Sequence, residues 1–216
     1  MNTLIGGFLL VFAALFPIVN PPGTALLFLA MTRRGTHADR AALAQRIAIY
    51  AFMIMVASLY IGAFVLALFG ISVPVLRVAG GIVVALTGWQ LLHGEDLGDN
   101  AEAQRAGDAA LHRMAFYPLT MPLTTGPGTI AVTIALGAGR PETVGQFDLF
   151  GVGALLAALA VALLILVCYR NADRVEQFVG KTTSDAMAKL FAFILICIGI
   201  EIFWAGFRDL WRTIGA

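Results

Sequence analysis

Two short windows of proline, glycine and threonine contain the residues of this sequence best suited to bind a solute. The first is Asn20-Pro21-Pro22-Gly23-Thr24 and the second is Thr125-Gly126-Pro127-Gly128-Thr129. Both lie in long apolar stretches, where proline interrupts a helix, and Asn20 followed by Pro21 is typical of a new helix start. We therefore predict a half-helix after each window, with its free amides and positive dipole end turned toward the middle of the protein.

Helix N-termini that face each other suit a carboxylate, because free amides and helix dipoles both favour an anion. Neither window contains an acidic or basic side chain. Uncharged hydrogen-bonding groups accompany the prolines instead: Asn20, Thr24, Thr120, Thr124, Thr125 and Thr129. This chemistry favours a small neutral solute with a carboxylate, such as an amino acid, over a polycation or a bare metal ion. The alternative is two ordinary proline kinks, whose backbone groups are satisfied by neighbouring contacts.

The two windows also match each other along the chain. Moving the segment 16–24, which contains the first window, forward by 105 residues places Pro17 on Pro122, Pro22 on Pro127, Gly23 on Gly128 and Thr24 on Thr129. Interrupted apolar segments at corresponding places in two halves of a chain are the best sequence indication of a transporter binding site. We therefore expect the two windows to face each other near the bilayer midplane and to form one site.

The composition of the chain indicates the class of protein in which these windows lie. Hydrophobic residues make up 60% of the chain, charged residues only 12%, and the mean hydropathy is +0.88. Globular proteins have about a quarter charged residues, so this composition indicates an integral membrane protein. Short alternating segments typical of barrel strands are absent. We predict an all-α fold with six transmembrane helices: Leu4–Met31 (broken), Ile47–Phe69, Ile71–Leu92, Met114–Ala138 (broken), Leu149–Tyr169 and Met187–Phe207.

A polar, acidic connector over residues 93–113 divides the chain into repeats of three spans, residues 1–92 and 114–216. Ten of the fourteen Lys and Arg residues lie in or beside the first, third and fifth loops. The positive-inside rule then places those loops in the cytoplasm and both termini outside, on the periplasmic side in a bacterium. With three spans each, the two repeats would have inverted topology. This parity holds only if the broken segments cross the membrane rather than re-enter it.

Glu201 is the one acidic residue well inside a predicted span. Intramembrane carboxylates are costly and often functional, so Glu201 is a candidate for carrying a coupling proton. The alternative is a surface anchor beside Trp204 and one to two turns from Arg208. Arg77 is expected to extend toward the outer interface, and pairing with Glu201 is the weaker interpretation.

The segments around the windows, 16–23 and 118–128, resemble the two signature segments of the MarC family of bacterial inner-membrane proteins. The resemblance extends over essentially the whole chain. It implies an inner-membrane protein whose relatives include described transporters or exporters of small neutral amino acids. By motif position it implicates Asn20, Pro21, Pro22 and Gly23 in the first half, and Gly126, Pro127 and Gly128 in the second. Pro22 departs from the commoner pattern, in which a bulkier aliphatic residue precedes the glycine.

Other functional classes find little support in the sequence. The chain contains no G-x-S-x-G, H-E-x-x-H or CxxC motif and no phosphate-binding glycine loop, which argues against an enzyme. A net charge of +1 argues against nucleic-acid binding, and no metal or cofactor is predicted. Cys168 and Cys197 read as small buried hydrophobes. Membrane lipids and a small solute are the expected partners. The rivals to a transporter are a channel and a regulatory membrane protein that transports nothing.

Overall fold

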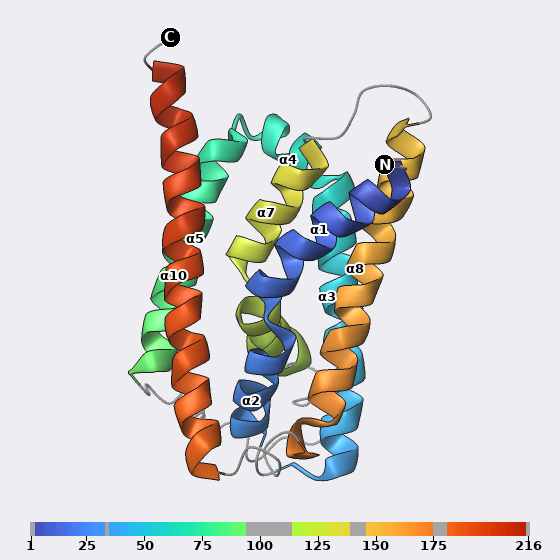
Figure 1. Cartoon of the computed structure of the whole chain (residues 1–216), viewed down its shortest axis with the longest axis vertical. Helices are drawn as coiled ribbons and strands as arrows, with labels where there is room; N and C mark the ends of the chain where they lie inside the picture. The colour runs from blue at the N-terminus through green and yellow to red at the C-terminus, as the bar shows by residue number, and fades with distance from the viewer. Residues whose placement is uncertain (1–2, 33–34, 94–113, 139–145, 175–180, 215–216) are drawn as a thin grey trace.

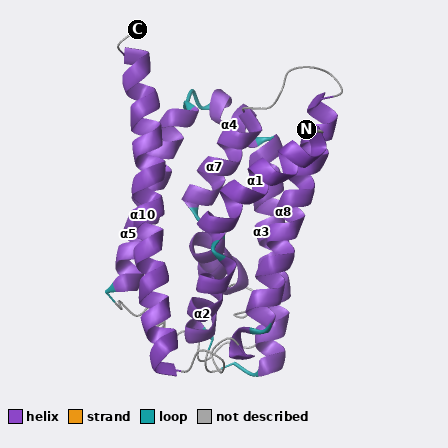
Figure 2. Cartoon of the chain, viewed as in Figure 1, coloured by secondary structure: helices purple, strands orange, loops and turns teal. Residues whose placement is uncertain are grey.

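The computed structural model describes residues 3–32, 35–93, 114–138, 146–174 and 181–214, and these form helices without strands (Figure 2). The first half contains α1 (Thr3–Val19), α2 (Pro21–Met31), α3 (His37–Tyr60), α4 (Gly62–Leu68) and α5 (Val73–Leu92). The second contains η2 (Ala115–Thr124), α7 (Pro127–Ala138), α8 (Gln146–Arg170) and α10 (Lys181–Ile214). Apart from His93, the predicted acidic connector lies outside the described residues.

The long helices run side by side along the length of the molecule (Figure 1). α1 starts at the end where both termini lie, and α2 continues to the opposite end, where α3 begins and returns. In the second half, η2 and α7 run toward the termini and α8 runs away from them. The broken helices of the two halves therefore point in opposite directions.

Length and composition allow four described helices to cross a membrane: Leu4–Leu29, His37–Tyr60, Val73–Gln90 and Leu149–Arg170. The pair η2 and α7, bent by 66°, makes a fifth if it is one span. The predicted sixth span, Met187–Phe207, lies within α10 but is not among these five. Large apolar side chains are more than half exposed on the outside of the bundle, as lipid contact requires: Leu86, Leu163, Val167, Ile200, Trp204 and Trp211.

The predicted span Ile47–Phe69 is wrong at both ends. A capping box at Thr36 and Asp39 starts α3 ten residues earlier, because the Asp39 amide bonds the Thr36 hydroxyl and the Thr36 amide bonds the Asp39 carboxylate. The helix ends at Tyr60, and residues 62–68 form the separate helix α4. Polar capping groups, which a count of apolar residues ignores, therefore set the start of this helix.

The main apolar core lies among α1, α3, η2 and α8. Its largest fully buried side chains include Leu15, Ile47, Met55, Leu119 and Ile165. α5 and α10 pack along each other beside this core (Figure 1). Thus α10, from the end of the chain, is held mainly by a helix of the first half.

Small residues bring the backbones of α5 and α10 into direct contact. A methyl group added to Gly81 would lie 2.6 Å from the Gly199 carbonyl oxygen, and one added to Gly199 would lie 2.8 Å from the Gly81 carbonyl oxygen. Gly88 approaches the Ala192 carbonyl oxygen in the same way, at 2.8 Å. The Gly81, Ala85 and Gly88 face is therefore a helix-packing face, a common use of small residues in membrane proteins.

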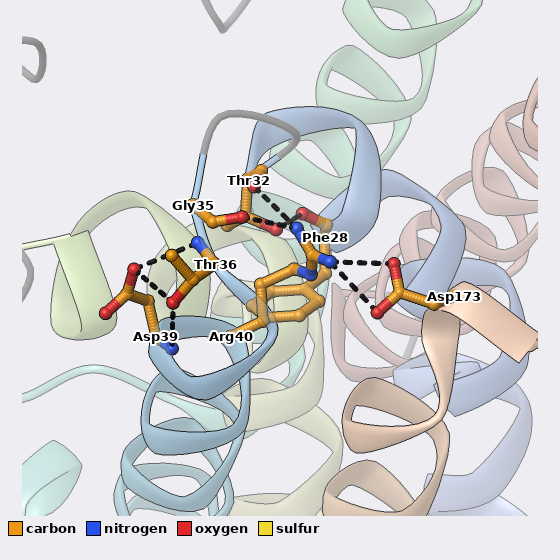
Figure 3. Close-up of polar contacts among 7 residues, drawn as sticks. All are labelled: Phe28, Thr32, Gly35, Thr36, Asp39, Arg40 and Asp173. Atoms are coloured by element: carbon orange, nitrogen blue, oxygen red, sulfur yellow. Dashed lines mark hydrogen bonds and ion pairs between the residues drawn. The ribbon is translucent and has the colours of Figure 1, made fainter.

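Arg40 links three chain segments at the end of the molecule opposite the termini (Figure 3). Its Nη2 donates to both carboxylate oxygens of Asp173, at 2.9 and 3.0 Å, just beyond the end of α8. Its Nη1 donates to the carbonyl oxygens of Gly35, at 2.7 Å, and Thr32, at 3.4 Å, where α2 has ended. One guanidinium thus ties the end of α2 and the start of α3 to the end of α8.

Replacing Arg40 with alanine is expected to destabilise the protein by about 1–3 kcal/mol, because it leaves the Asp173 carboxylate and the Gly35 carbonyl without this donor, whereas the Thr32 carbonyl still accepts from the Gly35 amide. Arg77→Ala is the matched control, since Arg77 makes one 2.7 Å bond to Asp209 with its side chain 30% exposed, against 14% for Arg40. Thermal unfolding of the detergent-purified variants measures both. Equal losses would contradict the assigned importance of Arg40.

Candidate functional site

A helix begins at the first window, and each backbone amide hydrogen of its first turn already has a hydrogen-bond acceptor. Asn20 adopts a left-handed conformation (φ 45°, ψ 61°) and its side-chain oxygen accepts a 3.3 Å bond from the Gly23 amide. Pro21 and Pro22 have no amide hydrogen, and the Thr24 amide donates to the Asn20 carbonyl oxygen at 2.9 Å. The predicted N-cap is confirmed, but the predicted free amides at this helix start are wrong, because proline and capping remove them.

The second window keeps amides that the first has lost. η2 is an irregular helical segment, because Tyr117 and Met121, which precede Pro118 and Pro122, have extended backbone angles, and it meets α7 at a 66° bend. The Ile130 amide donates to the Gly126 carbonyl oxygen at 3.1 Å, so Gly126 occupies the N-cap position and Pro127 is the first helical residue. The amides of Gly128 and Thr129 belong to the first turn, where a helix supplies no acceptor. The anion-favouring character is therefore stronger at this window.

Threonine hydroxyls satisfy backbone carbonyls around both breaks. Thr24 donates to the Asn20 carbonyl oxygen at 2.9 Å, and Thr124 donates to that of Leu119 at 2.6 Å. Thr120 and Thr125 likewise donate to the carbonyl oxygens five residues earlier. Such side chains replace backbone bonds that a broken helix loses in hydrocarbon. These hydroxyls therefore offer lone pairs to a ligand, but their protons are already used in bonds to the backbone.

A cavity of about 20 Å³ lies against the second window, enough for about one water molecule. Of the residues predicted for the site, Gly126, Pro127 and Thr129 line it. The remaining lining residues come from the first helix, α5, η2 and α10: Ile18, Val84, Thr87, Pro122, Leu123, Thr124 and Leu195. The cavity thus lies where the core bundle meets the α5 and α10 pair.

The predicted residues of the first window do not line this cavity. Pro21, Gly23 and Thr24 are buried, Asn20 is half-buried, and the Pro22 side chain is exposed on the outside of the helix. Thr125 and Gly128 of the second window are also buried beside the cavity without lining it. The first helix reaches the cavity through Ile18, two residues before Asn20. The departure from the family pattern at Pro22 therefore lies on a surface away from the cavity.

Tyr169 contacts both broken helices, and no motif in the sequence pointed to it. Its hydroxyl lies 2.8 Å from the Thr124 hydroxyl of η2. Its ring stacks on Phe28 of α2, with ring centres 4.7 Å apart. The spacing of residues could have indicated that Tyr169 is buried, because it ends a stripe of α8 with three- and four-residue intervals: Ala154, Ala158, Val161, Ile165 and Tyr169.

Glu201 does not face the cavity. Its side chain is exposed on α10, whereas its neighbour Ile202 is buried and would lie 3.5 Å from a methyl group on Gly128. Arg77 pairs with Asp209, one helical turn or more further along α10, rather than with Glu201. The carboxylate therefore lies at the level of the second window but on the other side of its helix, and its coupling role stays a prediction.

Cysteines and acidic groups add little to the site. Cys168 is half-buried and Cys197 is exposed on α10, so the expected burial of both cysteines is wrong for Cys197. Within the described parts of the chain, no three His, Cys, Asp or Glu side chains gather closely enough to hold a metal ion. The chemistry near the cavity is that of backbone dipoles and hydroxyl groups.

Comparison with known proteins identifies relatives of the whole chain. The family model described as MarC family integral membrane protein matches residues 5–211. The inner membrane protein MarC of Salmonella typhimurium is 32% identical over 206 residues, which cover 92% of this chain and 93% of that protein. The inner membrane protein MarC of Escherichia coli O1:K1 / APEC is 33% identical over 209 residues, with the same coverage. No solved structure matches the chain.

Gly128→Ala is expected to destabilise the protein by about 1–3 kcal/mol, because the new methyl group would overlap the Val84 side chain. Adding Val84→Ala should recover much of that loss, since it makes room for the methyl group. Gly126→Ala provides the contrast, because its methyl group would lie 2.8 Å from the Pro122 carbonyl oxygen, a backbone atom that no side-chain truncation moves. Thermal unfolding of the purified variants measures the three effects. Strictly additive losses in Val84→Ala/Gly128→Ala would contradict the contact.

Proposed function

Because this chain belongs to the MarC family of integral membrane proteins, we propose that it is an inner-membrane transporter that moves a small neutral solute, such as an amino acid. The solute would pass through a midplane site between the two broken helices. The observation that carries this proposal is the cavity at the 66° bend between η2 and α7, where the first helix, α5 and α10 meet the second window.

The proposal includes six crossings arranged as two inverted repeats, residues 1–92 and 114–216. Its support is the direction of the helices, because α5 runs away from the termini and its neighbour α10 runs toward them. The opposite directions of α1–α2 and η2–α7 agree with an axis in the membrane plane. In this arrangement α5 and α10 are equivalent helices.

A carboxylate is the solute group that the second window would bind. The amides of Gly128 and Thr129 and the dipole of α7 favour an anion, and none of the ten residues that line the cavity is charged. An amino group would find acceptors among the hydroxyl oxygens and carbonyls of the broken segments. The two windows would then differ in role, with the second binding the anionic end.

The cavity has room for about one water molecule, so this conformation is closed to an amino acid. Transport then requires η2 and α7 to move relative to α5 and α10, as expected for gating of one repeat against the other. A channel-like protein, or a regulatory membrane protein without transport, is the alternative. Uncharged lining residues favour a neutral solute over an ion.

Reconstitution tests the proposal directly. Purified protein in proteoliposomes should show saturable, gradient-driven flux of at least one small neutral amino acid. Planar bilayers containing the same protein should carry no ion current above background. Ion current without saturable solute flux would favour the channel-like alternative.

Thr129→Val should reduce that flux at least about tenfold, because it removes a hydroxyl from the cavity wall next to the proposed carboxylate position. Thr133→Val is the matched control: Thr133 lies one turn further along α7, donates to the Thr129 carbonyl oxygen at 2.6 Å and does not line the cavity. Initial rates at several solute concentrations measure both variants. Equal reductions would contradict a solute position at Thr129.

Glu201→Gln tests proton coupling. We expect the variant to express normally and to lose any dependence of transport on the pH gradient, because the amide carries no titratable proton. Since Glu201 is exposed on α10, a coupling role also requires a movement that turns it toward the solute path. Persistence of pH-gradient dependence in the variant would assign Glu201 to surface anchoring instead.

A further inference from the structure

We propose that Tyr169 is a positioning residue that latches the two broken helices together in the closed conformation. Its hydroxyl holds Thr124 of η2 while its ring packs on Phe28 of α2, and the hydroxyl must release Thr124 when the cavity opens. This inference rests on the proposed transport function. It adds a residue that lies in neither window.

The contacts of Tyr169 reach both halves of the chain from a third helix. The side chain is 1% exposed, near the end of α8. Its oxygen lies 2.8 Å from the Thr124 hydroxyl and its ring stacks on Phe28, and these two partners are 1% exposed or less. One tyrosine therefore connects α2 with the last residue of η2.

The proton positions give the direction of the bond between Tyr169 and Thr124. Thr124 gives its proton to the Leu119 carbonyl oxygen at 2.6 Å. A carbonyl only accepts, so the Thr124 hydroxyl meets Tyr169 as an acceptor and the Tyr169 hydroxyl is the donor. When this bond breaks, η2 can move while the tyrosine ring stays against Phe28 of α2.

Neighbouring contacts fix the rest of the tyrosine. The ring stacks on Phe28 with centres 4.7 Å apart. Four residues later, Asp173 is held by both of its carboxylate oxygens to Arg40. With the ring and the following turn held, the hydroxyl is the part of Tyr169 whose partner can change.

Thr124 connects this latch to the proposed solute site. Its side chain accepts from Tyr169, and the residue also lines the cavity at the second window. Moving η2 away from the cavity to make room for a solute would therefore strain or break the bond between Tyr169 and Thr124. The bond stabilises the closed conformation and opposes opening.

Tyr169→Phe tests the latch, since it removes the hydroxyl and keeps the ring against Phe28. Hydrogen–deuterium exchange in lipid nanodiscs should become about three- to tenfold faster in residues 115–125 and 21–31, as expected for one lost hydrogen bond. Exchange in α5 should not change. Tyr60→Phe is the matched control, because the Tyr60 hydroxyl donates to the Gly151 carbonyl oxygen at 2.7 Å and joins α3 to α8 away from the windows.

Thr124→Val breaks the same bond from the other side and should accelerate exchange in residues 21–31 as well. If Tyr169→Phe and Tyr60→Phe change exchange in the same segments, or if neither Tyr169→Phe nor Thr124→Val affects residues 21–31, the latch is overturned.

Transport measurements separate this inference from the proposed function. The latch predicts that Tyr169→Phe raises the maximal rate of solute flux relative to wild type, with a smaller effect on the half-saturating concentration. Faster local exchange in a protein that moves no solute would retain the latch and reject transport. Solute flux with unaltered exchange in Tyr169→Phe would retain transport and reject the latch.

Discussion

Satisfying backbone polar groups in apolar surroundings is the constraint on which this structure depends. The two proline windows break the regular helical bonding, and the surrounding side chains restore it: Asn20 caps Gly23, and threonine hydroxyls bond carbonyls around both breaks. These bonds use most of the hydrogen-bond donors near the breaks. What is left for a ligand is the first turn of α7, together with hydroxyl and carbonyl lone pairs. The chemistry of the candidate site thus follows from the way in which the breaks are stabilised.

Close backbone packing then determines where these groups lie. Glycines bring α5 and α10 into contact at Gly81 and Gly199, and this pair stands against the second window through Val84 and Ile202. The cavity forms where the pair meets η2 and α7, and only about one water molecule fits. Small residues let the two backbones approach closely, so the position of the cavity wall on this side depends on glycine.

Polar links between the halves are concentrated in few residues. Arg40 and Asp173 join the end of α2 to the end of α8, and Tyr169, one turn before Asp173, bonds Thr124 of η2 and stacks on Phe28 of α2. The segment 169–173 therefore holds the closed arrangement at two levels, one beside the site and one at the end of the molecule. In the proposed transport cycle, these bonds would be exchanged, while the apolar core of α1, α3 and α8 stays packed.

The sequence by itself determined the membrane class, the helical fold and the location of both breaks, because these follow from local composition and from the backbone chemistry of proline and glycine. The family was recognised from the resemblance of segments 16–23 and 118–128 to its signature segments. The ends of helices were harder to predict from the sequence, because α3 begins at a polar capping box that a pattern of apolar residues does not reveal. Tertiary structure alone decided which groups meet. It decided that Pro22 and Glu201 are exposed and that the threonine protons bond backbone carbonyls. It also placed Tyr169, Val84, Thr87 and Leu195 beside the broken segments. The physical reason is that hydrogen-bond partners and facing surfaces depend on how helices far apart in the chain pack, which no local pattern encodes.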